Sequence, residues 1–369
     1  MENRTHRRRR KRVSPMRVAL FILAGILFVV IVAGASALIL WNRSAVLNQQ
    51  KMFVPQQLTD IGAPTPQPSA TPEPETAWVP DSYDLYWDGA YYRLRKNVVS
   101  VLFMGIDSAK NQATDSEIVS GTNQADTLLL GVFDTENGSV RVLHIPRDTE
   151  ADVKVLDMTK KYVSTQRMHI CLQHAYGDGG SLSCELTMDA VSNLLFGAPI
   201  YRYVSLGTKG AAKAVNAIGG VELEMLDDFS FYSKSMAKGN VVKLNGNRAL
   251  VYIRARQDKG LDGTDQGRMK RQEQFLEAFM LTVKERSKQN PALALTVYEE
   301  IKDYLQTNLS LEELLFLANQ AISSGFSKEN LVSLPGTVGS EAQPLYHMDD
   351  EAARQLVLDL FYERIDNAA

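Results

Sequence analysis

The sequence predicts an α/β protein, a three-layer α/β/α sandwich with a mixed central sheet, preceded by one transmembrane helix. Three observations lead to this prediction. Apolar runs of strand length alternate with helical segments along the chain. An Asn-Gly turn joins two of these runs, which makes part of the sheet antiparallel. A charge-free apolar segment lies near the N-terminus, whereas 45% hydrophobic and 22% charged residues overall are ordinary for a globular protein.

The N-terminal region predicts a membrane anchor. Residues 1–17 carry a net charge of +7 and the remaining 352 carry −10, which gives the formal net charge of −3. Residues 18–41 contain no charge over 24 positions, enough to cross a bilayer core as a helix. The positive-inside rule places residues 1–17 in the cytoplasm and the chain after Asn42 outside. We therefore expect a single-pass plasma-membrane protein with an extracellular C-terminal domain.

A cleaved signal peptide is the alternative for this segment. Ala35-Ser36-Ala37 resembles a cleavage site. The apolar run is longer than an ordinary signal-peptide core, however, and it continues through Leu38-Ile39-Leu40 beyond that site. This length favours an uncleaved anchor.

The rest of the chain divides into a linker and a folded domain. Residues 42–82 are Pro-rich, most densely at 64–80, which predicts a stiff, extended extracellular linker. Residues 83–369 are predicted to form one domain, with residues 291–369 as its C-terminal helical extension. Because the basic tail adjoins the anchor and the rest of the chain is acidic, we expect the plasma membrane, and no nucleic acid, as its partner.

Three apolar runs predict the centre of the sheet. Residues 98–105 form a continuous apolar run, and so do residues 127–134, as expected of buried strands. Residues 139–145 form the third strand, which Pro146 ends. Asn137-Gly138 predicts a hairpin between the second and third strands.

This arrangement brings three charged residues to one edge of the sheet. Asp107 ends the first strand, Asp126 begins the second, and Arg147 follows the third. If the first and third strands run parallel, all three side chains lie at the same edge, where α/β proteins commonly bind ligands.

Further elements follow in alternation. The periodicity predicts helices at residues 186–197 and 209–220, and strands at residues 201–206 and 221–225. Residues 245–256 predict a short helix, and a long helix begins near Asp265. The apolar face of this long helix, residues 275–283, belongs to the core or lines a groove for a lipid chain.

Four arginines lie within eighteen residues around a glycine-rich loop, at Arg254, Arg256, Arg268 and Arg271. Guanidinium groups match phosphate oxygens two at a time, so the cluster favours a polyphosphate ligand. Asp265, Arg268 and Gln272 share one helical face if the long helix begins near Asp265. The alternative is a solvated basic surface tethered by the neighbouring aspartates.

Cys171 and Cys184 are the only cysteines. An isolated pair outside the membrane predicts a disulfide. A zinc site with the neighbouring His169 and His174, or two free thiols, are the alternatives.

An ordered set of short motifs resembles the LytR-CpsA-Psr family of bacterial envelope proteins. No single motif is specific, but their order along residues 97–290 is. The motifs are Gly105-Ile106-Asp107, Ala125-Asp126-Thr127, Ile145-Pro146-Arg147-Asp148, Ala175-Tyr176-Gly177 with Gly179-Gly180, Gly219-Gly220-Val221, Gly246 with Ala249-Leu250, Arg254-Ala255-Arg256, and Asp265 with Arg268 and Arg271-Gln272.

The resemblance implies a phosphotransferase outside the plasma membrane. Such enzymes take a glycopolymer, for example teichoic acid or capsular polysaccharide, from a polyprenyl-pyrophosphate carrier and attach it to peptidoglycan through a phosphodiester. Asp107 and Asp126 match the family's magnesium ligands. The residues that match its pyrophosphate ligands are Arg147, Arg254, Arg256, Arg268 and Gln272. The base is unresolved among Asp107, Asp126 and Asp265, so that Asp265 joins the expected catalytic residues.

Two other functions use the same residues. A pyrophosphatase would transfer the phosphoryl group to water instead of a glycan. A non-catalytic envelope protein would bind the lipid-linked glycan or regulate through its cytoplasmic tail. A Ser-His-Asp hydrolase is not supported, because the sequence has no Gly-x-Ser-x-Gly elbow.

Overall fold

The computed structural model describes most of the chain after the predicted linker. The described residues are 84–107, 123–255, 261, 265–290, 292–324, 328–340 and 345–365. The expected basic tail, anchor and linker lie outside these residues, and so does Arg256. Within the described part of the chain, no helix has the length and apolar character needed to cross a membrane.

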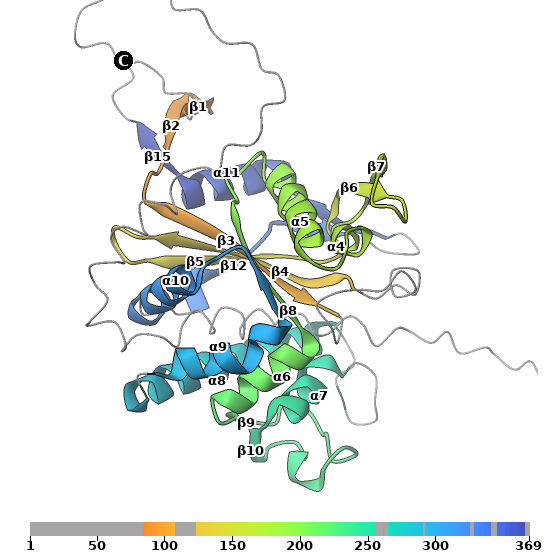
Figure 1. Cartoon of the computed structure of the whole chain (residues 1–369), viewed down its shortest axis with the longest axis vertical. Coiled ribbons are helices and arrows are strands. Elements are labelled where there is room, and N and C mark those ends of the chain that lie inside the picture. The colour runs from red at the N-terminus through yellow and green to blue at the C-terminus, as the bar shows by residue number, and fades with distance from the viewer. Residues whose placement is uncertain are drawn as a thin grey trace, which may run out of the picture.

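A mixed sheet of six strands forms the centre of the fold (Figure 1). Its order is β11-β8-β3-β4-β5-β12. The central strand β3 is antiparallel to β4 and parallel to β8, and β5 is antiparallel to β4 and parallel to β12. The mixed sheet predicted from the Asn-Gly turn is therefore confirmed. The strands are β3 (Val98–Ile106), β4 (Ala125–Asp134), β5 (Val140–Ile145), β8 (Arg202–Gly207), β11 (Leu305–Thr307) and β12 (Leu331–Ser333).

Helices cover both faces of this sheet. Because side chains alternate along a strand, neighbouring residues enter the hydrophobic clusters on opposite faces. Val101 and Phe103 of β3 belong to one hydrophobic cluster, and Leu102 and Met104 belong to another. The first cluster contains residues of α6 (Thr208–Ala217), α7 (Gly246–Arg254), α8 (Asp265–Gln289), α9 (Leu293–Ile301) and α10 (Leu311–Ser323). The second contains residues of α5 (Ser181–Leu194) and α11 (Asp350–Phe361). Figure 1 shows these two groups of helices on opposite sides of the sheet.

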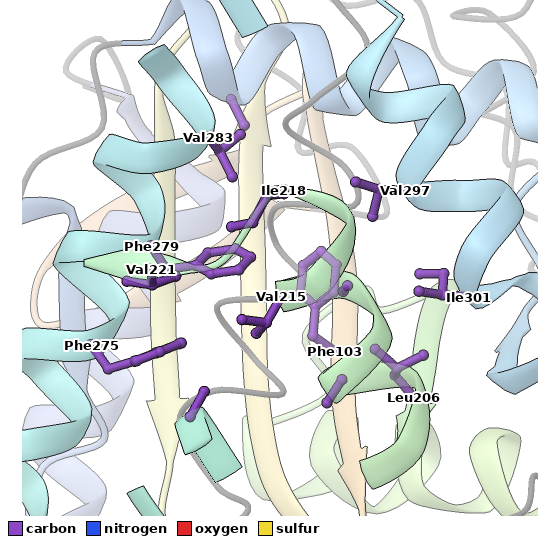
Figure 2. Packing of buried hydrophobic residues seen from close by; sticks show 14 of the residues in the cluster. Phe103, Leu206, Val215, Ile218, Val221, Phe275, Phe279, Val283, Val297 and Ile301 are labelled. Atoms are coloured by element: carbon purple, nitrogen blue, oxygen red, sulfur yellow. The ribbon is translucent and has the colours of Figure 1, made fainter. Parts of the chain in front are cut away.

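The apolar face of α8 packs into the first cluster. Figure 2 shows Phe275, Phe279 and Val283 of α8 in the same cluster as Phe103 of β3. Each of these α8 side chains is at most 1% exposed. Of the two interpretations open from the sequence, this face is core.

The predicted helices and strands are present, with shifts at their ends. The helix expected at residues 186–197 is α5, which begins at Ser181. Asp178 explains the earlier start, because its Oδ1 accepts the backbone N–H groups of Gly180 and Ser183. The strand expected at residues 221–225 is β9 (Val221–Glu224), which pairs with β10 (Val241–Leu244) outside the central sheet.

Three small sheets were not expected from the sequence. The first is a hairpin of β6 (Glu150–Leu156) and β7 (Tyr162–His169). The second is an antiparallel pair of β13 (Gly336–Val338) and β14 (Tyr346–Met348), and Tyr346 of β14 bridges to Thr149, just before β6. The third sheet joins β1 (Asp84–Trp87) and β2 (Ala90–Leu94) to β15 (Tyr362–Ile365). Most side chains of β7 are exposed, so its sequence lacks the apolar pattern that would have predicted a strand.

Two buried histidines are expected to lower the free energy of unfolding at acid pH. Burial lowers the pKa of His144, in β5, to about 4, and it lowers the pKa of His174, in α4 (Leu172–Tyr176), to about 4. A histidine in an unfolded chain titrates near pH 6.5. Between these values each histidine binds a proton only in the unfolded chain, so each lowers the free energy of unfolding as the pH falls. Asp126 contributes the opposite sign, because burial raises the pKa of its carboxyl to about 8 in the fold. We expect a loss of roughly 3 kcal/mol per histidine by pH 4.

Urea unfolding between pH 7.5 and 4.5 measures this loss. In His174→Gln the slope against pH is expected to be shallower than in the wild type. His347→Gln is the control, because that side chain is 40% exposed. Equal slopes in His174→Gln and the wild type would contradict the prediction.

Candidate active site

The three charged residues that the sequence places at one sheet edge meet there. Asp107 directly follows β3, Asp126 lies at the start of β4, and Arg147 follows β5. The Arg147 Nη1 donates to Asp126 Oδ1. The Asp126 side chain is fully buried and that of Arg147 is 11% exposed. An ion pair therefore links the start of β4 to the segment that follows β5 at this edge.

Two residues that the sequence analysis did not select complete the contacts of Arg147. Its Nη2 donates to Gln124 Oε1 at 2.8 Å, and its Nε donates to Asp148 Oδ1 at 3.2 Å. The guanidinium is thus held by three side chains. Gln124 lies two positions before Asp126, and Asp148 is the last residue of the quoted motif Ile145-Pro146-Arg147-Asp148, which gave a signal for its place but not for its role.

Arg254 forms a second ion pair at the same edge. Its Nη2 lies 3.2 Å from Asp107 Oδ1, and its side chain is 29% exposed. Helix α7 delivers it: Asn245 caps the helix by accepting from Arg248 N, and Gly246 lies so close to α6 that a Cβ there would be 2.0 Å from Ala212 O. The close approach of α7 to α6 therefore depends on glycine at position 246.

Arg271, by contrast, is a structural residue. Its side chain is fully buried, and its Nη1 donates to Asp227 Oδ2. Its other nitrogens donate to Tyr252 O at 3.2 Å and to Ala255 O at 2.6 Å, so it ties the end of α7 to α8. The four-arginine cluster thus contains at least one member that stabilises the backbone.

The remaining predicted site residues lie on α8 or outside the described residues. Gln272 is 1% exposed, and its Nε2 donates to Ile253 O at 3.3 Å. Asp265 and Arg268 belong to α8, which begins at Asp265 as expected, but their side chains lie outside the described residues. Helix α7 ends at Arg254, and Ala255 is extended.

The two carboxylates are strongly desolvated. Burial raises the pKa of Asp126 to about 8, although Arg147 opposes the shift. Burial also raises the pKa of Asp107, opposed by Arg254 and Arg147. Asp126 Oδ2 is buried and accepts no hydrogen bond from the described residues. Once it is deprotonated, a carboxylate oxygen with no donor is the kind of ligand that a hard divalent cation takes.

Carboxylate oxygens, the donors at this edge, suit a hard cation such as magnesium. The described residues contain no group of three or more His, Cys, Asp or Glu side chains placed to hold a metal. Magnesium ordinarily takes one or two carboxylates and completes its shell with water and phosphate oxygens. Asp107 and Asp126 would serve as those carboxylates. Asn123, which has a left-handed φ of 67° and is 1% exposed, donates its backbone N–H to Asp107 O at 3.5 Å.

The predicted disulfide is wrong, because both cysteines are free and buried. The Cys171 Sγ lies 3.7 Å from Gln124 Oε1, and the Cys184 Sγ lies 3.8 Å from His174 Nε2. Each thiol therefore has its own polar neighbour. Burial raises the pKa of each thiol to about 12, which keeps both protonated and unreactive.

We expect reducing agent to leave the melting temperature unchanged. Reduction of a disulfide enclosing a loop of this size would cost about 3 kcal/mol, which thermal unfolding with and without dithiothreitol detects. The double variant Cys171→Ser, Cys184→Ser is the control, since it has no thiol to reduce. If dithiothreitol lowered the melting temperature of the wild type but not of the double variant, the two cysteines would form a disulfide after all.

Comparison with known proteins identifies a family and relatives that this chain is similar to. The LytR_cpsA_psr family model matches residues 76–359. The polyisoprenyl-teichoic acid–peptidoglycan teichoic acid transferase TagV of Bacillus subtilis is 31% identical over 268 residues, which cover 69% of this chain and 62% of TagV. The match thus spans less than two thirds of that relative. TagU of Enterococcus faecalis is 29% identical over 260 residues, covering 69% of this chain and 76% of TagU.

A solved structure shows the fold independently. Protein gbs0355 from Streptococcus agalactiae superposes with a TM-score of 0.54 over 71% of this chain and 87% of its own, at 18% identity. At this identity the likeness concerns the fold.

Proposed function

The chain belongs to the LytR-CpsA-Psr family, and we propose that it transfers a glycopolymer from a polyprenyl-pyrophosphate carrier to peptidoglycan through a phosphodiester bond. The names of its relatives, which are teichoic acid transferases, support this reaction. The observation that carries it is the pair of Asp–Arg contacts at one sheet edge, Arg147 with Asp126 and Arg254 with Asp107. Arginines that can bind a pyrophosphate and carboxylates that can bind a cation thus lie at the same edge of the sheet.

The arginines supply the pyrophosphate site. The side chains of Arg147 and Arg254 are 11% and 29% exposed at the edge of the sheet. An arginine about 4 Å from a phosphate charge contributes roughly 4 kcal/mol before desolvation at an effective dielectric of 20. Several arginines are needed, because the pyrophosphate must also leave water. We assign Arg256, Arg268 and Gln272 to the same pyrophosphate.

Asp107 and Asp126 would hold a magnesium ion. When bound, the ion neutralises charge on the pyrophosphate. The Oδ2 of Asp126, which has no hydrogen-bond partner among the described residues, supports this assignment. Arg147 fixes the other oxygen of Asp126, so only one orientation of the carboxylate is available to a ligand.

The proposed reaction is an in-line displacement at phosphorus. A hydroxyl oxygen of peptidoglycan forms a bond to the glycan-side phosphorus, and the bond from that phosphorus to the bridging oxygen breaks. Polyprenyl phosphate leaves with the bonding electrons, and the hydroxyl proton passes to a base. Catalysis of such a step is mostly positioning and electrostatic stabilisation, which the arginines provide.

We further propose that residues 18–41 anchor the enzyme in the plasma membrane with residues 1–17 in the cytoplasm. The charge asymmetry of these segments supports this topology. The Pro-rich residues 42–82 then hold the catalytic domain, residues 83–369, outside the cell. A lipid-linked donor is confined to that same membrane, so the anchor keeps enzyme and donor together.

Transfer is tested with the full chain purified in detergent. The donor is a glycan on polyprenyl pyrophosphate, and release of polyprenyl phosphate is measured with and without magnesium and peptidoglycan oligomers. Release that requires both supports the transferase. Release without the oligomers identifies a pyrophosphatase, and binding without release identifies a non-catalytic glycan-binding protein.

Three arginine variants separate catalysis from folding in this assay. Arg254→Gln is expected to lower transfer by roughly 100-fold while the protein stays folded. Arg271→Gln is expected to unfold the protein, because it leaves the buried Asp227 without its cation. Arg141→Gln, at the opposite end of β5, is the control and should retain full transfer. If Arg254→Gln transferred the glycan as fast as Arg141→Gln, Arg254 would have no role in the pyrophosphate site.

Magnesium binding has a readout independent of activity. We expect 10 mM magnesium, an excess over roughly millimolar affinity, to raise the melting temperature of the wild type at pH 8 but not that of Asp126→Asn. The rise should shrink at pH 6, because a proton competes with the cation for a carboxyl whose pKa is about 8. Asp189→Asn, an exposed surface carboxylate, is the control. The same rise in Asp126→Asn would exclude Asp126 as a ligand.

A further inference from the structure

A β-bulge interrupts the pairing of β3 and β4 at the edge that carries Asp126. Thr127 pairs with Gly105, whereas Ala125 pairs with the residue that directly follows Gly105, so Asp126 is the extra residue of β4. The burial agrees with this, because Ala125 and Leu128 belong to the same hydrophobic cluster. In an uninterrupted strand, residues three positions apart face opposite sides. The bulge therefore takes the Asp126 side chain out of the alternation of β4.

The backbone of Gln124 closes this bulge. Its carbonyl oxygen accepts the N–H of Asp107 at 3.1 Å, across the two strands, and the N–H of Asp126 at 3.0 Å, within its own segment. The two carboxylates proposed to hold magnesium thus belong to residues whose backbone N–H groups share one acceptor. Gln124 itself is buried, with 7% of its surface exposed.

The side chain of Gln124 contacts the arginine that pairs with Asp126. Its Oε1 accepts from Arg147 Nη2 at 2.8 Å, and the Cys171 Sγ lies 3.7 Å from the same oxygen. Cys171 is held from both sides, because its N donates to Arg147 O at 3.2 Å and its O accepts from Ala125 N at 3.0 Å. The contact of Gln124 with Arg147 thus belongs to a hydrogen-bonded network that joins the start of β4 to the segment after β5.

The three side chains that hold Arg147 differ in charge. Asp126 and Asp148 are carboxylates, whereas Gln124 is a neutral amide. A carboxylate beside Arg147 opposes the approach of a pyrophosphate, because like charges repel. The amide oxygen orients the guanidinium through Nη2 without adding to this repulsion. Orientation matters, because a guanidinium binds two phosphate oxygens at once only when its planar fork faces them.

We propose that Gln124 is a positioning residue for the pyrophosphate of the donor, which it serves by holding the Arg147 guanidinium in the orientation that binds phosphate. The same residue closes the bulge that carries Asp126, so one residue positions both the arginine and the carboxylate. This inference rests on the proposed function. Because Gln124 acts through Arg147, its substitution should weaken donor binding only where position 147 has an Nη2 to hold.

A double-mutant cycle tests this dependence in the transfer assay with the full chain in detergent. We expect Gln124→Leu to raise the KM for the lipid-linked donor by roughly 10-fold, since a hydrogen bond to a charged group is lost. In the Arg147→Lys background the same change should raise this KM by less than about 2-fold, because lysine has no Nη2. An equal factor in both backgrounds would overturn the proposal, since a merely structural residue acts regardless of position 147.

Gln173→Leu is the matched control. Gln173 is also a buried glutamine, but its Oε1 accepts from Lys154 N at 2.7 Å and its Nε2 donates to Lys154 O at 3.1 Å. Its substitution should lower the melting temperature and leave the KM for the donor unchanged.

Gln124→Glu covers the case in which Gln124→Leu is poorly folded. It retains an oxygen for Nη2 but places a negative charge beside the bound pyrophosphate, so the KM for the donor should rise by about 10-fold. A wild-type KM in this variant would also overturn the proposal.

Binding of inorganic pyrophosphate, measured by calorimetry, repeats the cycle without turnover. The same dependence on position 147 is expected in its Kd. If the wild type shows this dependence but releases no polyprenyl phosphate, the proposed transfer fails and the positioning role stands. Release by the wild type with no dependence in either KM or Kd overturns the positioning role alone, so the two failures are distinct.

Discussion

The ion pair between Arg147 and Asp126 is the constraint on which the site depends. Removing both charges from water is costly, and such a pair contributes little net stability. The surrounding residues limit this cost, because Gln124 and Asp148 each accept a further guanidinium N–H. They do not remove it, since burial still raises the pKa of Asp126 and leaves its Oδ2 without a partner in the described chain. The fold thus holds a buried carboxyl whose second oxygen is left for the cation of the proposed function.

The arginine-rich segment shows how burial separates structural from functional residues of one type. Arg271 is fully enclosed and bonds to two backbone oxygens at the end of α7. Arg254, the last residue of that helix, is 29% exposed and contacts Asp107 across the sheet edge. One arginine therefore holds the helix end so that the other reaches the edge. Sequence spacing alone assigns both to the same cluster, because it carries no information on burial.

The central strands and the charged edge were predictable, whereas much of the surrounding site was not. Long apolar runs and one Asn-Gly turn determine the order of β3, β4 and β5, which places Asp107, Asp126 and Arg147 together. Strand β7 is mostly exposed and carries no such pattern, so His169 could not be placed beside Asp148. The cysteines were misassigned because separation along the chain does not reveal that their thiols face different neighbours.

Before any substrate arrives, each described arginine of the site is already paired with an aspartate. Binding a pyrophosphate therefore exchanges one anion for another at Arg147 and Arg254, and it leaves Asp126 and Asp107 with less compensating charge. In the proposed function a cation at these carboxylates supplies that compensation. Each ligand then lowers the cost of binding the other, and such coupling is reciprocal by thermodynamic necessity. Paired charges in the free enzyme thus favour joint binding of metal and donor over binding of either alone.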